Sequence, residues 1–196
     1  MLCAARQRCQ TIGCTGRTNI VTAFDKAFEL IIGQEGGYGA DTRDPGNWTG
    51  GRCGSGTCRG TKYGISAASY PMVDIAGLSP STAKVIYHRD YWAAIRADEM
   101  PPALALLVFD AAVNNGVGQA IRWLQAATKV LVDGQLGAQT MAAVAAASCQ
   151  GPALMAEFQS LRLIFMTGLP TWKTFGHGWA RRLCRMPYDA NLMEAI

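Results

Sequence analysis

The segment from Pro102 to Asn115 constrains the fold most, because a helix formed here is apolar on nearly every side. Its sequence is PALALLVFDAAVNN, and a helix without a polar face is buried on most sides. The apolar stretch is interrupted by Asp110 and is shorter than the roughly 20 residues that a membrane-spanning helix needs. We therefore expect a central core helix, in which a buried Asp110 must be hydrogen-bonded and structural rather than catalytic.

Helical spacing of apolar residues recurs elsewhere in the chain, whereas the alternation typical of strands is nearly absent. Thr22 can cap a first helix, with Asp25 in its first turn and Gly36 and Gly37 at its end. Helices are predicted over residues 22–35, 79–97, 119–130, 138–147 and 153–167. The glycine-dense stretch 33–60 predicts a long loop or a small irregular β lobe, and a loop of that length is usually functional. The fold class is mainly α.

Composition excludes some classes of protein. With 49% hydrophobic and 16% charged residues, the chain is not intrinsically disordered. A net charge of +4 favours anionic surfaces without identifying one. Seven cysteines, an odd number, argue against a full disulfide framework. Residues 1–19 read as a flexible basic leader, because they lack the apolar core of a secretory signal.

Glu35 is the first candidate for chemistry, because it continues the apolar stripe of Phe28 and Ile31 at helical spacing. A carboxylate there faces the core and stands in the last turn of its predicted helix. Partial desolvation and the negative end of the helix dipole should both raise the pKa of Glu35, as a general acid requires. The alternative is a helix-end glutamate that turns out to solvent.

The loop after Glu35 supplies polar partners. Cleavage of a glycosidic bond needs an acid with a raised pKa and a second polar group that positions water or stabilises the transition state. Such groups are present within reach of Glu35, although Asp-Pro-Gly is by itself more often a turn than a catalytic element. They are Asp41, Asp44, Asn47, Thr49 and Thr61.

Several blocks of the sequence together resemble glycoside hydrolase family 108, the N-acetylmuramidases found among phage endolysins. They are QEGGYGADTRDPGNWTGG, GTKYGISAASYP, YHRDYW and FDAAVNNGVGQAIRWLQ. The later blocks VDGQLGAQTMAAV and FGHGWARRL resemble the small helical peptidoglycan-binding domain that accompanies this family. The resemblance implies a lysozyme-like helical domain with a small glycine-rich lobe and a packed C-terminal helical subdomain.

The resemblance also implies catalytic residues. Glu35 would be the acid, with Asp44 and a threonine opposite it across the sugar. The family's short link to the Tyr-Gly-Ile block is stretched here by the segment 48–60, so Thr61 matches by context and Thr49 by distance. We favour Thr61. Whether the reaction retains or inverts the anomeric configuration depends on the distance between the carboxylates.

Substrate contacts are expected from Tyr38 and Tyr63, which lie in two of the matching blocks. Asn114 and Asn115 can end the core helix or place two amides in the cleft. The aromatic residues of 87–92 can stack on sugars, although aromatic residues at helical spacing usually belong to the core.

Two other clusters of residues can be interpreted without a role in catalysis. Cys53 and Cys58 are too few for a zinc site, and a disulfide between them needs an oxidising compartment. We therefore predict no metal and no cofactor. Arg181, Arg182 and Arg185 form either a solvated face or a patch that binds the anionic wall.

The sequence therefore predicts a leader (1–19), a lysozyme-like catalytic domain (20–115) and a helical peptidoglycan-binding subdomain (116–190). The expected activity is hydrolysis of the β-1,4 bond between N-acetylmuramic acid and N-acetylglucosamine, in a phage endolysin for host lysis. A lytic transglycosylase and a non-catalytic wall-binding phage module are the alternatives. The expected partner is bacterial peptidoglycan, without nucleic acid or stable membrane insertion, and the chain is expected to be a monomer. Without a signal peptide, it should stay in the host cytoplasm until released to the periplasm and cell wall.

Overall fold

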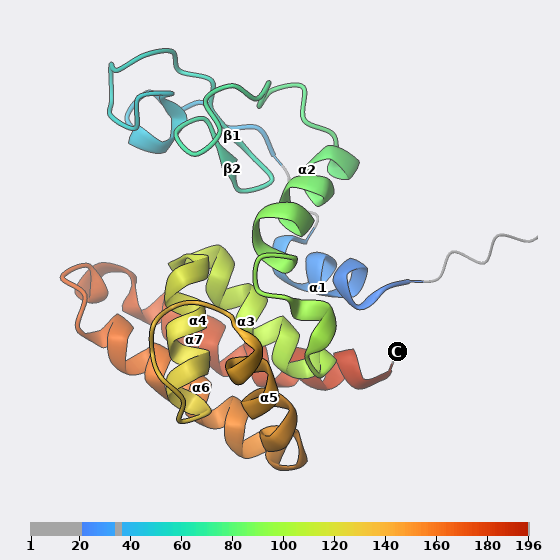
Figure 1. Ribbon diagram of the computed structural model, residues 1–196. Coiled ribbons are helices and arrows are strands. Elements are labelled where there is room, and N and C mark those ends of the chain that lie inside the picture. Colours follow the sequence, from blue (N-terminus) through green and yellow to red (C-terminus); the bar gives the residue numbers. More distant parts are fainter. Residues whose placement is uncertain (1–20, 34–36, 196) are drawn as a thin grey trace, which may run out of the picture.

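The computed structural model describes residues 21–33 and 37–195 and is mainly helical, as predicted (Figure 1). The α-helices are α1 (Ala23–Ile32), α2 (Pro80–Tyr87), α3 (Pro102–Asn115), α4 (Val117–Ala127), α5 (Ala138–Ala147), α6 (Gly151–Thr167) and α7 (Trp172–Asn191). Two-residue strands β1 (Thr61–Lys62) and β2 (Ile65–Ser66) pair antiparallel. The shorter helical turns are η1 (Pro45–Asn47), η2 (His88–Trp92), η3 (Ala97–Glu99), η4 (Ser148–Gln150) and η5 (Leu192–Ala195).

Helix α3 lies at the centre of the helical body, with the bounds that its sequence predicts. Every residue from Ala103 to Ala112 is buried, including Asp110. Helices α1, α4, α6 and α7 all contact α3. The resulting core runs from Phe24 in α1 to Met193 in η5. The division of the chain near residue 115 therefore stays a prediction, since one continuous core includes residues on both sides of it.

Helix α1 begins as predicted but ends earlier. The Thr22 hydroxyl accepts a hydrogen bond from the Asp25 backbone N–H at 3.1 Å, and the Asp25 carboxylate accepts one from the Thr22 N–H at 2.9 Å. The helix stops at Ile32 because Gly33 adopts a φ of +61°, so the predicted end at Gly36 is wrong. Glu35 is therefore not part of the last turn of α1, contrary to the prediction from the sequence, and it lies outside the described residues.

The predicted single helix over 79–97 is also wrong. Helix α2 ends at Tyr87 and passes into the π turn η2, which the Ala93 N–H closes on the His88 carbonyl at 2.8 Å. Arg96 then turns the chain with a φ of +50°. The wider turn places Trp92 in the core, where its indole N–H donates to Asp98 at 2.8 Å.

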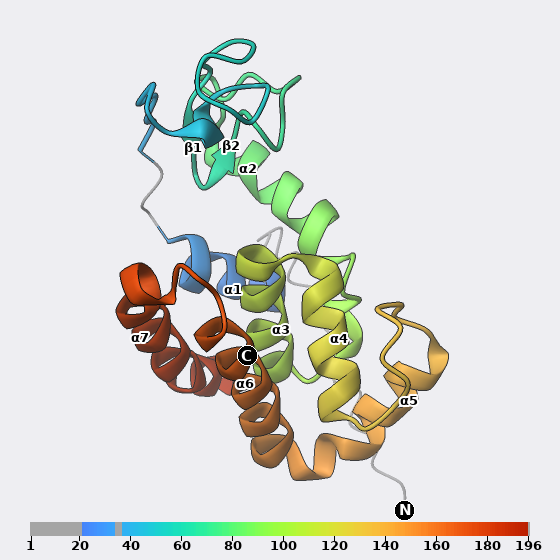
Figure 2. The same ribbon diagram turned by 90° about the vertical axis from the view of Figure 1, so that its left-hand side faces the viewer.

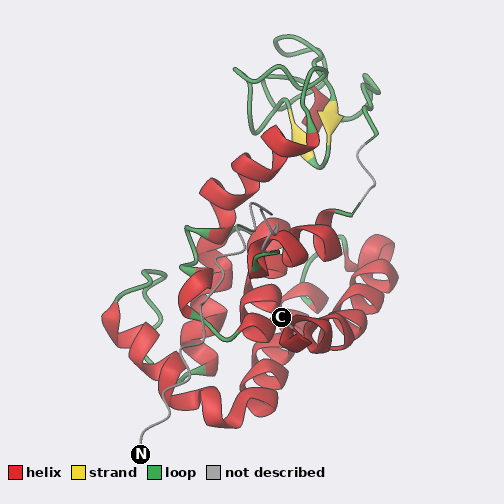
Figure 3. Cartoon of the chain, turned by 90° about the vertical axis from the view of Figure 1, so that its right-hand side faces the viewer, coloured by secondary structure: helices red, strands yellow, loops and turns green. Residues whose placement is uncertain are grey.

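The glycine-dense region forms the predicted irregular lobe around the β1–β2 hairpin. Figure 2 shows the lobe projecting from one end of the helical body, with α2 leading to it. Figure 3 shows that the strands occur only in this lobe among the described residues. Tyr63 and Gly64 form the hairpin turn with φ values of +53° and +73°.

Helix α7 is the element that the sequence did not predict. It contains Gly176 and Pro187, both of which disfavour a helix interior. A Cβ on Gly176 would lie 2.6 Å from the Trp172 ring, so the glycine allows the indole to pack on the helix. Pro187 lacks an N–H for the Leu183 carbonyl, and the Gln159 amide of α6 donates to that carbonyl at 3.5 Å instead. None of the described helices combines the length and apolarity needed to cross a membrane.

Candidate active site

Asp44 lies at the start of the turn η1 in the lobe. One of its carboxylate oxygens accepts a hydrogen bond from the Gly46 N–H at 2.8 Å, which caps the turn. Pro45 at the first position of the turn has no N–H to satisfy. The Asp44 side chain is exposed. The local sequence thus folds as the turn that Asp-Pro-Gly predicts while presenting a carboxylate to solvent.

Asn47 ties the turn to the rest of the lobe. It is 3% exposed, and its Oδ1 accepts a hydrogen bond from the Thr61 hydroxyl at 2.8 Å. Its Nδ2 donates to the Asp41 carbonyl at 3.0 Å, and its N–H donates to the Asp44 carbonyl at 3.1 Å. Asn47 therefore joins Asp44 to Thr61 across the inserted segment 48–60. The sequence marked Asn47 only as one polar residue of the loop.

The two candidate threonines occupy different places. The Thr61 side chain is hydrogen-bonded to the buried Asn47, beside the Asp44 turn. The Thr49 hydroxyl accepts a hydrogen bond from the Thr57 N–H at 2.9 Å and so serves the inserted segment. This geometry favours Thr61, and its catalytic role stays a prediction.

Asp41 is paired rather than free. Its carboxylate lies 2.7 Å from Nη2 of Arg43, and the guanidinium holds the pKa of the Asp41 carboxyl below its ordinary value. Both side chains are exposed. Asp41 is therefore suited to an ionised, structural role rather than to that of a proton donor.

The predicted substrate residues of the lobe differ in exposure. Tyr38 is 49% exposed and lines a hollow of about 450 Å³ with Arg59 and Asp74. Tyr63 is half-buried, and its carbonyl accepts a hydrogen bond from the Tyr87 hydroxyl at 2.9 Å. Burial raises the pKa of Tyr87 to about 12, so this donor stays protonated. The bond fixes the β1–β2 turn against α2.

Asn114 and Asn115 diverge at the end of α3. Asn114 is exposed, and its Nδ2 donates to the Asp110 carbonyl at 2.7 Å. The Asn115 Oδ1 accepts a hydrogen bond from the buried Arg162 at 2.9 Å. Both amides therefore belong to the hydrogen-bond network around Asp110, and Asn114 is the more exposed of the two.

A groove of about 460 Å³ runs beside the end of α1. Leu30 and Ile31 of α1, Asn114 of α3 and Trp179 of α7 lie on its walls. Gly33, two residues before Glu35, follows directly after α1. The predicted acid Glu35 falls in the stretch 34–36, which the structure does not describe.

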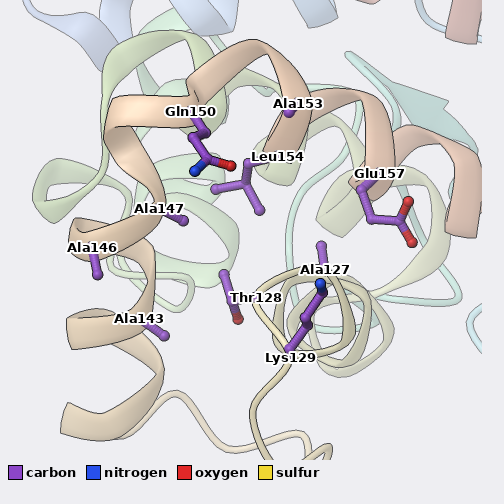
Figure 4. Close-up of a pocket in the computed structure, with 10 residues that line it drawn as sticks. All are labelled: Ala127, Thr128, Lys129, Ala143, Ala146, Ala147, Gln150, Ala153, Leu154 and Glu157. Atoms are coloured by element: carbon purple, nitrogen blue, oxygen red, sulfur yellow. The ribbon is translucent and has the colours of Figure 1, made fainter.

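The remaining features do not add catalytic groups. Cys53 and Cys58 are both free, and their thiols lie near the carbonyls of Arg43 and Ala40. Across residues 21–33 and 37–195, no three His, Cys, Asp or Glu side chains are grouped as a metal site. A hollow of about 500 Å³ lies between α4, α5 and α6, and half of its lining residues are alanine (Figure 4). Glu157 is the only acid among the described residues of its lining, so it lacks the acid pair of a glycosidase.

Comparison with known families decides the class of enzyme. Residues 28–116, which include the lobe, α3 and Glu35, match the family Glycosyl hydrolase 108. Residues 28–116 are thus similar to glycosyl hydrolase 108 domains. With this match, the chain is a glycoside hydrolase of the kind that acts on peptidoglycan.

The similarity to solved structures extends beyond this domain. The structure of Brucella abortus SagA is 29% identical, with a TM-score of 0.71. The alignment covers 87% of this chain and 94% of SagA. A search of curated proteins found no match. The helices after residue 116 thus belong to an arrangement that also occurs in SagA.

Proposed function

We propose that this glycosyl hydrolase 108 enzyme is an N-acetylmuramidase. It cleaves the β-1,4 bond between N-acetylmuramic acid and N-acetylglucosamine, with Glu35 as general acid and Asp44 and Thr61 as its partners. The observation that carries the proposal is the link from Asp44 through Asn47 to Thr61, inside the matched domain that also contains Glu35.

The geometry of the lobe suits the handling of a water molecule. The Thr61 hydroxyl donates its hydrogen bond to Asn47, so the lone pairs of its oxygen can accept a hydrogen bond from water. Asp44 uses one carboxylate oxygen for the Gly46 N–H at 2.8 Å. Its other oxygen can accept from water or stabilise positive charge on the sugar, the two roles that a second carboxylate takes in glycoside hydrolysis.

Mass spectrometry of the fragments released from purified peptidoglycan tests the bond specificity. After borohydride reduction, a muramidase yields fragments that end in reduced muramic acid. Reduced glucosamine ends would contradict the proposed bond. Anhydro-muramic ends would identify a lytic transglycosylase instead, because no water then enters the product. If no fragments are released, the proposed activity is contradicted, and the chain would instead be a non-catalytic wall-binding module.

We also propose that the enzyme serves in host lysis, as the resemblance to phage endolysins suggests. Expression of the chain inside a bacterium should leave the culture intact until a membrane pore is supplied, after which the cells should lyse. The variant Glu35→Gln is the matched control and should not lyse the cells. Absence of lysis by the wild-type chain after pore formation would contradict this role.

A further inference from the structure

The groove beside α1 is built from two parts of the chain. Leu30 and Ile31 come from the glycosyl hydrolase domain, as does Asn114. The opposite wall belongs to α7, which lies outside the matched range 28–116. The α7 residues on it include Trp179, Arg181, Arg182 and Arg185. A helix outside the family domain therefore completes a groove at the edge of that domain.

The groove lining carries an excess of positive charge. Arg181, Arg182 and Arg185 face a single lining acid, Asp189. Arg185 lies 3.1 Å from Asp189, but its side chain is 70% exposed. Among the described residues, no hydrogen bond or ion pair involves the Arg181 side chain. The guanidinium groups of Arg181 and Arg185 can therefore reach an anion that enters the groove.

Arg182 is fixed rather than free. Its Nη2 lies 2.6 Å from Asp110, which also binds the buried Arg162. One carboxylate thus serves two guanidinium groups, so this cluster does not cancel the charge of the groove. The arginine patch predicted from the sequence is therefore divided between one anchored residue and two accessible ones.

Trp179 gives the groove an aromatic surface. Its ring centroid lies 6.1 Å from that of Trp172 and 6.0 Å from that of Phe175, so neighbouring rings brace it. Gly178 also lines the groove, and a Cβ placed on it would meet nothing within 4 Å. A braced indole beside open space is suited to stack on the apolar face of a sugar ring.

We propose that this groove binds the peptide-bearing part of the peptidoglycan strand. Trp179 stacks on a sugar ring, while Arg181 and Arg185 bind the carboxylates of the peptide stem. Guanidinium groups suit this task because they bind carboxylates through paired N–H donors. The inference rests on the proposed function, because it assumes that peptidoglycan is cleaved near α1.

The test compares two substrates and matched variants. Glycan strands with intact peptide stems are compared with strands stripped of their stems by an amidase. Arg181→Gln combined with Arg185→Gln should raise KM for stem-bearing strands about tenfold and leave KM for stripped strands within about twofold. Trp179→Ala should raise KM for both substrates. Lys173→Gln is the control, because Lys173 is an exposed cation of α7 outside the groove.

A second measurement uses the unaltered enzyme. A soluble stem peptide should compete with stem-bearing strands and should not inhibit cleavage of stripped strands. Because this competition measurement uses the wild-type enzyme, it tests the inference even if a variant fails to fold. Equal KM values of the double variant and the wild type, together with no inhibition by the peptide, would overturn the inference. Failure of the wild type to cleave either substrate would instead contradict the proposed function.

Discussion

The Arg162 guanidinium lies 2.5 Å from the Asp110 carboxylate, and the two side chains are only 1% and 0% exposed. Arg162 belongs to α6 and Asp110 to α3, so the pair joins the C-terminal helices to the core of the glycosyl hydrolase domain. Burial lowers the pKa of Arg162, because desolvation disfavours its charge. The Asp110 carboxylate is therefore the partner that compensates the burial of this arginine.

We expect Asp110→Asn to lower the free energy of unfolding by about 3–5 kcal/mol, because it leaves a buried arginine without its counter-charge. Chemical denaturation measures the change. Asp74→Asn, at an exposed aspartate of the lobe, is the control and should cost less than about 1 kcal/mol. A similar small loss for Asp110→Asn would show that the pair is dispensable.

Removal of the chain after Asn115 should prevent folding of the remainder. Phe158, Met186 and Ala190 belong to the same core as α3, and their loss exposes apolar surface. We expect an insoluble fragment, whereas the full chain should unfold in one transition. A soluble fragment with the helix content of α1 to α3 would contradict this expectation and favour two independent domains.

Stability should fall in acid partly through Asp25. Lys84 lies 2.6 Å away and, with the Thr22 backbone, lowers the pKa of Asp25 from 3.8 to about 2. A lowered pKa stabilises the folded state above the unfolded pKa, and this contribution disappears as the pH falls from about 4 to about 2.

Asp25→Asn should therefore cost about 1 kcal/mol at neutral pH, a value reduced for partial exposure of the pair. Unfolding by urea at a series of pH values measures this. The difference from the wild type should vanish near pH 2. A constant difference across the pH range would mean that the pair does not set the pKa.

Substitution of the two candidate threonines should affect the rate of hydrolysis differently. Thr61→Val removes the hydroxyl beside Asn47 and should lower kcat at least about tenfold if this group orients water. Thr49→Val removes a hydroxyl that is hydrogen-bonded only within the inserted segment. Its kcat should stay within about twofold of the wild-type value. Hydrolysis rates on purified peptidoglycan measure both. The reverse order would assign the role to Thr49.

Much of the fold could be predicted where local sequence and tertiary packing agree. The segment from Pro102 to Asn115 has no polar face, so its apolar residues require burial, and α3 has those bounds. The Thr22 cap likewise depends on residues within one turn of each other. The end of α1 differs from the prediction because Gly33, which precedes the predicted glycine pair, already adopts the positive φ that ends the helix.

The missed elements depend on distant contacts. Helix α7 tolerates Pro187 because the Gln159 amide, 28 residues earlier in the chain, binds the Leu183 carbonyl that the proline cannot. The central place of Asn47 in the candidate site likewise depends on Thr61, beyond the inserted segment. No local pattern signals such pairs, whereas Asp44 was found because its turn chemistry is local.

The central claim is that Glu35 supplies the proton for cleavage of peptidoglycan, and the direct measurement is the rate of fragment release by Glu35→Gln. We expect a loss of at least about a hundredfold, because an amide cannot act as general acid. The thermal midpoint should stay nearly unchanged or rise. Glu29→Gln, at an exposed glutamate of α1, is the matched control and should keep full activity. More than about a tenth of the wild-type rate in Glu35→Gln would contradict the account.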